Sequence, residues 1–317
     1  MDASPHSSYV VEVNGIHLHY LDCGGSGPIL LFLAGMGCNA HIFDRFAPRF
    51  IDQFHVLALT RRGHGESDHP ETGYDIDTLT EDIHLFLDRL KIDRAILAGH
   101  SLAGIEMSHF AALHPERLLK LVYLDAAFYR NLPEFSIMQE KNPLRQIQNP
   151  GLNADFYSAQ EYFAALKKAF PSLAVIWGSV IEEQGLHELT IRPDGKLVDR
   201  MSSAIESALD ATLSSYEPED AKIRVPTLSF AAFPDATDFI SRETMTEALQ
   251  AQVIEFFATI RHAWLLQSMQ QFRRNVPHAK IVEIPHSHHY CFIKDEELVF
   301  EGMRKFLLED CSTHGIA

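Results

Sequence analysis

Eight short runs rich in valine, isoleucine, leucine and phenylalanine recur along the chain, and each has the length of a β-strand. The dipeptide Asn14-Gly15 separates the first two runs and tolerates the positive φ values of a tight hairpin turn. Helical patterns separate the later runs, which is typical of parallel βαβ units. We therefore predict an α/β fold with a mostly parallel, eight-stranded sheet flanked by helices. The predicted strands are Tyr9–Val13, Ile16–Leu21, Ile29–Leu33, His55–Leu59, Ala95–Ala98, Leu119–Leu124, Thr227–Ala231 and Lys280–Ile284.

Two segments between these strands show a clear helical pattern. Asp77–Leu90 carries a stripe of apolar residues at helical spacing, and Thr78 and Glu81 have the spacing of a capping box at its start. A second helix is predicted after Ser101, and it must end before Pro115, which cannot continue it.

The strand pattern is interrupted in residues 128–224. Polar turns and two helical stretches, Ala159–Ala169 and Met201–Ser214, take its place, together with many aromatic residues. A long helical pattern, Glu243–Arg274, follows the seventh strand. We predict that residues 128–224 form a helical cap inserted after the sixth strand, and that residues 1–127 and 225–317 form the core domain.

The charge composition of the chain limits the classes of molecule that it is expected to bind. The 317-residue chain has 27 Lys and Arg against 43 Asp and Glu, a net charge of −16, and such a chain repels phosphate backbones and anionic lipid headgroups. We expect a small-molecule substrate, with no nucleic acid and no membrane as partner, and no cofactor.

The four cysteines form no C-x-x-C pair, and no signal-peptide pattern is present at the N-terminus. These features predict a cytoplasmic protein, whereas nothing in the sequence indicates its oligomeric state.

The sharpest chemical signal is Gly99-His100-Ser101-Leu102-Ala103-Gly104, which lies between a predicted strand and a predicted helix. A serine on such a tight turn projects its hydroxyl into a cleft, provided that small residues stand two positions before and after it. Gly99 and Ala103 meet that requirement. The backbone N–H of Leu102, at the helix start, would face a negative charge that develops beside Ser101. A serine that only caps the helix is the alternative interpretation.

A serine nucleophile needs a base, and histidine is the side chain whose ordinary pKa suits that role near neutral pH. His289 follows the last predicted strand, at the edge of the sheet where parallel α/β folds place their sites. The third member would orient the imidazole. Asp235, just after the seventh strand, is the preferred candidate, and Asp238 and Asp125 are the alternatives. The order serine, aspartate, histidine is that expected for this type of triad.

These segments resemble the α/β-hydrolase superfamily, in the group that has a helical cap after the sixth strand. The resemblance extends from Val10 to Leu308 and implies that the N–H groups of Met36 and Leu102 form an oxyanion hole. It is carried by LLFLAGMG (Leu30–Gly37), LALTRRGHGESD (Leu57–Asp68), LAGHSLAG (Leu97–Gly104), VPTLSFAAFPD (Val225–Asp235) and AKIVEIPHSHH (Ala279–His289).

Three positions depart from the family pattern. Ala34 stands in place of the usual histidine before Gly35, and Thr60 in place of the aspartate that commonly precedes the Arg-Gly-x-Gly turn. His288 occupies the position of a glycine that usually precedes the catalytic histidine, so that His288 is an alternative to His289 as the base.

We therefore predict a serine hydrolase that cleaves a small or medium carboxylic ester through an acyl-enzyme. Lactone, amide and C–C bond hydrolysis use the same constellation, and a non-catalytic receptor of the same fold is a further alternative. An NADP-dependent oxidoreductase is a weaker alternative, based on Gly35-Met36-Gly37-Cys38-Asn39-Ala40 and on Arg61 and Arg62 as phosphate ligands. Metal binding by His286, His288 and His289 is weaker still, and we predict no metal.

Overall fold

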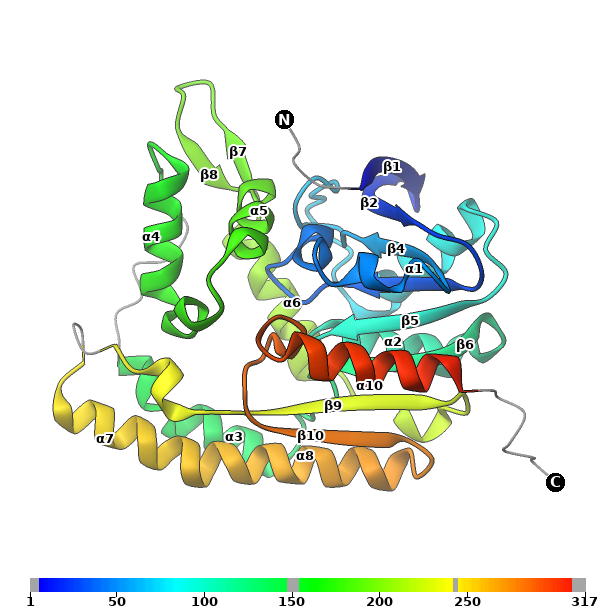
Figure 1. Cartoon of the computed structure of the whole chain (residues 1–317). Coiled ribbons are helices and arrows are strands. Elements are labelled where there is room, and N and C mark those ends of the chain that lie inside the picture. The colour runs from blue at the N-terminus through cyan, green and yellow to red at the C-terminus, as the bar shows by residue number, and fades with distance from the viewer. Residues whose placement is uncertain (1–5, 147–153, 242–244, 310–317) are drawn as a thin grey trace.

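The computed structural model describes residues 6–146, 154–241 and 245–309. Its centre is an eight-stranded sheet with the order β1-β2-β4-β3-β5-β6-β9-β10, in which β2 runs antiparallel to β1 and β4 and the other neighbours are parallel (Figure 1). The predicted mostly parallel sheet is thus confirmed. The strands are β1 (Ser7–Val13), β2 (Ile16–Gly24), β3 (Ile29–Leu33), β4 (His55–Leu59), β5 (Ala95–His100), β6 (Leu118–Leu124), β9 (Thr227–Pro234) and β10 (Lys280–Ser287).

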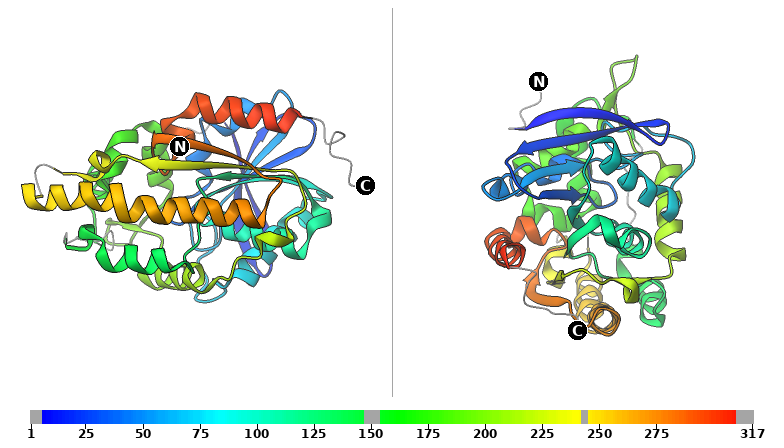
Figure 2. Two further views of the ribbon diagram at one scale, coloured as in Figure 1. Left: turned by 90° about the horizontal axis from the view of Figure 1, so that it is seen from below. Right: turned by 90° about the vertical axis from the view of Figure 1, so that its right-hand side faces the viewer.

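The sheet is buried between two layers, as the alternation of side chains along a strand requires. In β3, Leu30 and Phe32 pack in one apolar cluster with Phe50 and Met303, whereas Leu31 and Leu33 belong to the cluster on the opposite face. Helix α10 (Glu296–Leu308) covers the first face, and α1 (Ile76–Arg89), α2 (Ala103–Leu113) and α8 (His262–Asn275) cover the second (Figure 2). Because both faces are covered, the central strands read as continuous apolar runs.

Helix α1 begins at Ile76, one residue before the start that its sequence pattern predicts, and its N-cap residue also differs from the predicted one. The side chain of Asp75 accepts a hydrogen bond from the N–H of Thr78, so Asp75 is the N-cap of α1. Thr78 and Glu81 therefore lie within the helix, and the predicted capping box is wrong. Asp75 takes this role because an aspartate accepts hydrogen bonds from first-turn N–H groups as well as threonine does.

Between β6 and β9, the described residues form four α-helices, several short 3-10 turns and a small two-stranded sheet. The sequence pattern did not predict the small sheet. Helix α4 has the predicted bounds, and α6 lies within one or two residues of them. We call residues 128–224 the insertion, and their role as a cap stays a prediction. The elements are α3 (Pro133–Lys141), α4 (Ala159–Ala169), α5 (Ser179–His187), β7 (Leu189–Ile191), β8 (Leu197–Asp199) and α6 (Ser203–Ser215).

The long helical segment after β9 consists of α7 (Glu247–Phe256) and α8, which follow each other as one rod beside β9 and β10 in Figure 1. A π-helical turn, Phe257–Arg261, joins them. The predicted start at Glu243 lies outside the described residues, and within them α7 begins after Thr246, whose side chain caps it. No helix in the described part of the chain combines the length and the apolar character needed to cross a bilayer.

Candidate active site

Ser101 lies at the turn between β5 and α2, as its sequence context predicts. Its φ of +54° is in the left-handed region that non-glycine residues rarely adopt, and this strain is typical of a residue at a functional turn. The surroundings allow only small side chains. A Cβ atom at Gly99 would lie 2.8 Å from the Cβ of Ala103, and one at Gly104 would lie 1.9 Å from the carbonyl oxygen of Ala126. Ser101 is half-buried, and its hydroxyl has no hydrogen-bond partner among the described residues.

The loop after β3 lies directly beside this serine. A Cβ atom at Gly35 would be 3.0 Å from the Cβ of Ser101, so the loop approaches the turn at a distance that only glycine permits. The guanidinium of Arg61 donates to the carbonyl of Ala34 at 2.8 Å and fixes the start of the loop.

Met36, in this loop, and Leu102, which follows Ser101, are the predicted oxyanion-hole residues. Within the described part of the chain, neither N–H donates a hydrogen bond to another backbone group. Leu102 belongs to one apolar cluster with Ile205 and Leu209 of α6, and Met36 packs against that cluster, so the insertion contributes to the packing around both residues. The position of the two N–H groups is compatible with their predicted role, which stays a prediction.

His289 lies in the loop between β10 and α9 (Cys291–Lys294), and its imidazole is bonded to a carboxylate. Nδ1 of His289 lies 2.7 Å from Oδ2 of Asp125, which comes directly after β6. A carboxylate only accepts, so Nδ1 carries the proton and donates it, and Nε2 is left as the basic nitrogen. The site that the sequence predicted with Asp235 is therefore formed with Asp125, one of the two alternatives.

Asp235 does not reach His289. It accepts a hydrogen bond of 2.7 Å from Nδ1 of His286, and this pair is exposed at the ends of β9 and β10. Asp238, the other alternative, pairs with Lys294 at 2.9 Å. The structure does not support the preference for Asp235, because β9 continues to Pro234 and Asp235, which follows it, pairs with His286 of β10 instead of His289.

His288 is a structural residue rather than the base. It is buried, and its Nδ1 accepts a hydrogen bond from the N–H of Tyr290 at 3.1 Å. Burial lowers the pKa of His288 to about 3, because desolvation disfavours the charged imidazolium. A neutral, buried ring of this kind cannot exchange protons with a substrate, so His289 is the better candidate.

His100 connects the serine turn to the histidine loop. Its Nε2 donates to the carbonyl of His289 at 3.0 Å, and the two rings lie 4.5 Å apart. Because His100 directly precedes Ser101, this hydrogen bond joins the two segments that carry the predicted nucleophile and base. Burial and the nearby His289 hold the pKa of His100 well below its ordinary value, which keeps this ring neutral.

The two arginines of the oxidoreductase alternative are buried and paired. Arg61 donates to Glu106 at 2.5 and 2.6 Å, and Arg62 donates to Asp82 at 2.5 and 2.7 Å. Both side chains are nearly inaccessible to solvent. They hold the loop after β4 and cannot receive the 2′-phosphate of a dinucleotide.

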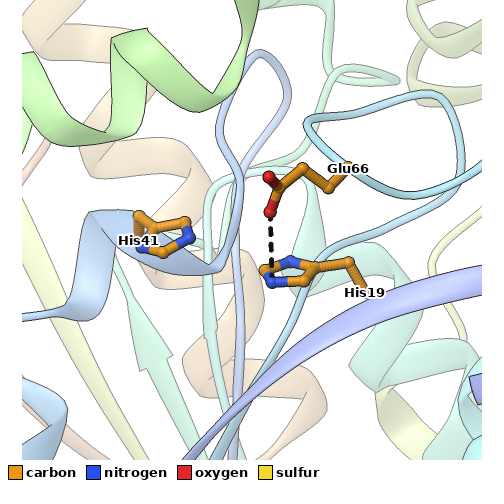
Figure 3. Close-up of side chains that lie close together, drawn as sticks. All are labelled: His19, His41 and Glu66. Carbon is orange, nitrogen blue, oxygen red and sulfur yellow. Dashed lines mark ion pairs between the residues drawn. The ribbon is translucent and has the colours of Figure 1, made fainter. Parts of the chain in front are cut away.

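One group of side chains has the composition of a metal site. His19, His41 and Glu66 offer ligand atoms that all lie within 4.8 Å of one another, and Figure 3 shows the carboxylate of Glu66 directed towards His19. Zinc ligands at their usual bond lengths would be ~3.4 Å apart in a tetrahedral site, so these residues would have to move closer to hold an ion. In the present arrangement Glu66 pairs with His19 at 3.4 Å and with His187 at 3.2 Å.

This group joins the insertion to the core. His187, at the end of α5, stacks on His41 with ring centroids 3.6 Å apart, and its hydrogen bond lowers the pKa of Glu66 to about 2. Beside it, the buried carboxylate of Glu188 accepts hydrogen bonds from Nδ2 of Asn39 at 2.8 Å and from the N–H of Gly65 at 3.0 Å. Glu188 was not predicted from the sequence, because a glutamate at a helix end is usually solvated.

Comparison with known proteins agrees with this fold. The family model described as alpha/beta hydrolase fold matches residues 28–181. The 2-(acetamidomethylene)succinate hydrolase of Mesorhizobium japonicum is 38% identical over 105 residues, which are 33% of this chain and 38% of that protein. A putative non-heme haloperoxidase of Mycobacterium phage D29 is 38% identical over 104 residues, 32% of this chain and 37% of that protein. The chain thus spans less than two fifths of the length of each of these relatives.

The similarity in structure extends further than the similarity in sequence. The crystal structure of an E-2-(acetamidomethylene)succinate hydrolase superposes with a TM-score of 0.73 and covers 95% of this chain and 99% of its own. The sequence identity in that superposition is 22%, so it supports the fold alone.

Proposed function

This chain is a member of the α/β-hydrolase superfamily, and from that premise we propose that it is a serine hydrolase that cleaves small or medium carboxylic esters through an acyl-enzyme. The observation that carries the proposal is the 2.7 Å hydrogen bond between His289 and Asp125, formed beside the strained turn of Ser101. A buried carboxylate that orients an imidazole next to such a turn is the arrangement that activates a serine.

In the proposed reaction, Nε2 of His289 takes the proton of the Ser101 hydroxyl while Oγ attacks the acyl carbon. The N–H groups of Met36 and Leu102 stabilise the oxyanion of the tetrahedral intermediate. The imidazolium then gives its proton to the leaving alcohol, and the acyl group stays on Ser101. A water molecule, deprotonated by the same Nε2, attacks the acyl-enzyme and releases the acid. Asp125 holds the proton on Nδ1 throughout and favours the charged imidazolium.

Esters are the first choice of substrate because an alkoxide leaving group requires the least assistance. Lactones, amides and C–C bonds are alternatives that use the same residues. One relative is named as a 2-(acetamidomethylene)succinate hydrolase, so substrates that carry carboxylate groups belong in the first panel to be tested. Helix α6 of the insertion shares an apolar cluster with Leu102, and Met36 packs against the same cluster, which supports a role for the insertion in substrate selection.

Labelling with a fluorophosphonate probe tests the proposal directly. We expect covalent labelling at Ser101, located by peptide mass mapping, and no labelling in Ser101→Ala. Hydrolysis of 4-nitrophenyl esters of increasing acyl length should show a kcat for Ser101→Ala that is lower by about 10³- to 10⁶-fold, with folding retained. Labelling at another residue, or activity that survives in Ser101→Ala, would exclude this mechanism.

A further inference from the structure

Arg261 is a guanidinium without an acidic partner in the described part of the chain. It ends the π-helical turn between α7 and α8, and its Nε is buried with no hydrogen-bond partner among the described residues. The guanidinium lies over the rings of Phe257 and Phe239, 4.9 and 5.6 Å from their centroids. The two rings also contact each other, with centroids 4.5 Å apart, so both lie to one side of the guanidinium, and its N–H donors still require acceptors.

The carboxylates on the neighbouring elements are bonded to other groups. Asp125 accepts hydrogen bonds from His289 and from the N–H of Ala232. Asp235 accepts from His286, and Asp238 from Lys294. Arg261 is half-buried, and its buried Nε donates to none of these carboxylates, so this N–H has lost its hydration without gaining an acceptor. An unsatisfied buried donor of this kind is expected where a ligand supplies the missing hydrogen-bond acceptor.

The position of Arg261 is close to the proposed catalytic residues. Trp264 lies three residues further along the helix, on the same face, and its ring is 5.7 Å from that of Phe128. The ring of Phe128 lies 5.8 Å from that of His289. Arg261 is also within electrostatic range of Asp125, which follows β6, and of His288, which follows β10.

The contacts with two rings cannot replace the hydration that the buried Nε has lost. Burial lowers the pKa of Arg261, and the negative charge of Asp125 opposes this effect. An arginine nevertheless stays protonated in proteins, so its charge persists near the proposed active site. The chemical group that matches its planar edge is a carboxylate, which accepts two parallel N–H bonds.

We propose that Arg261 binds a carboxylate group of the substrate and thereby selects anionic over neutral acyl compounds. This inference rests on the proposed function and specifies its substrate class. The aromatic residues between Arg261 and His289 would contact the apolar part of the substrate between its carboxylate and the bond that is cleaved.

The test compares two phenyl esters with acyl chains of equal length, phenyl hydrogen glutarate and phenyl pentanoate, by following phenol release after subtraction of the uncatalysed rate. For the wild-type protein we expect a higher kcat/KM with the glutarate. In Arg261→Met, the KM for the glutarate should rise by about 10- to 100-fold, the range expected for the loss of a charged hydrogen-bonded pair. The KM for the pentanoate should change by less than about threefold.

Two further variants complete the experiment. Arg261→Lys keeps the charge but loses the paired donors, so its KM for the glutarate should lie between those of the wild type and Arg261→Met. Arg273→Met removes an exposed arginine from the same helix and should leave both substrates unaffected. Thermal melting of each variant shows whether it is folded, and Arg261→Lys tests the inference should Arg261→Met fail to fold.

The outcomes separate this inference from the proposed function. Equal loss of kcat on both esters in Arg261→Met would mean that Arg261 only supports Asp125, and would overturn the inference. The same holds if neither variant alters the KM for the glutarate while the fluorophosphonate still labels Ser101. Absence of labelling in the wild-type protein would instead remove the serine mechanism itself.

Discussion

Asp125 and His289, which lie 164 residues apart in the chain, are joined by a hydrogen bond of 2.7 Å between Oδ2 and Nδ1. The other carboxylate oxygen of Asp125 accepts from the N–H of Ala232 at 2.9 Å, so the side chain cannot rotate away. The φ of Asp125 is +48°, a conformation that aspartate tolerates better than most residues. The imidazole is therefore held by a carboxylate that is itself fixed between β6 and β9.

Replacing Asp125 tests its role in orienting the base. In Asp125→Asn the side chain keeps its shape, but its amide N–H₂ can donate to Nδ1 and stabilise the tautomer that leaves no basic Nε2. We expect kcat with a 4-nitrophenyl ester to fall by about 10⁴-fold at neutral pH, while the melting temperature changes little.

Asp235→Asn is the matched control, because Asp235 pairs with the exposed His286. We expect its kcat to stay within about threefold of the wild-type value, as for a surface substitution away from the site. A large loss in Asp235→Asn, with full activity in Asp125→Asn, would mean that the loop rearranges in solution and that Asp235 orients the base.

The neighbouring histidines give a second pair of variants with different expected outcomes. His289→Gln removes the basic nitrogen and should lower kcat by about 10³- to 10⁶-fold, as for Ser101→Ala. His288→Asn retains an acceptor for the N–H of Tyr290 and should keep most of the activity, with reduced stability from the smaller buried side chain. Steady-state kinetics and thermal unfolding of both variants distinguish the base from the structural residue. A greater loss of kcat in His288→Asn would reverse this assignment.

The existence of the eight strands was predictable because each is an apolar run of characteristic length, and their mostly parallel direction because helical segments separate the later strands. The ends of the strands were not. β9 continues three residues beyond its apolar run, through Phe233 to Pro234, and β10 continues three residues beyond its run, to Ser287. The strands extend this far because their parallel pairing supplies backbone hydrogen bonds, which cannot be read from the side chains. This extension bears on the choice of the acidic residue, since Asp235 follows the longer β9 and pairs with His286 of the longer β10.

Ser101 was predictable because its neighbours must be small, and this requirement is visible in the sequence. His289 was predictable from its place after the last strand. Asp125 follows directly after an apolar run, and for this reason it was one of the alternatives. Its positive φ could not be predicted from any local sequence pattern. Arg261 and Glu188 lie on helices that read as solvent-exposed, and their burial depends on how the helical segments pack.

The close contact at Gly104 gives a prediction about the framework of the site. In Gly104→Ala the new Cβ would lie 1.9 Å from the carbonyl oxygen of Ala126, so α2 must move away from the segment that carries Asp125. We expect the free energy of unfolding to fall by about 3 kcal/mol or more, and kcat to fall because Ser101 shifts relative to His289. Urea denaturation and steady-state kinetics measure the two effects.

Gly178→Ala is the control for that substitution, because a Cβ at Gly178 meets nothing within 4 Å and its φ is extended. The free energy of unfolding should change by less than about 1 kcal/mol in this variant. If Gly104→Ala is as stable and as active as Gly178→Ala, then α2 and the loop after β6 are not packed as closely as the structure shows.

Glu188 predicts how the stability of the protein depends on pH. Burial raises the pKa of this carboxyl from 4.5 to about 7, because the charged form loses its hydration in the contact between the insertion and the core. The folded protein therefore binds a proton that the unfolded chain releases between these two values. The free energy of unfolding should decrease by up to about 3 kcal/mol as the pH rises from 4.5 to 7.

Urea denaturation of the wild type and of Glu188→Gln at several pH values between 4.5 and 8 isolates this contribution. The glutamine variant should be less stable overall, because an amide nitrogen cannot accept the hydrogen bond from the N–H of Gly65, but its decrease over this range should be smaller by the contribution of one proton. Glu206→Gln, which changes an exposed residue of α6, should keep the wild-type slope. Identical slopes in wild type and Glu188→Gln would show that Glu188 is solvated, and that the insertion does not close over the core at this contact.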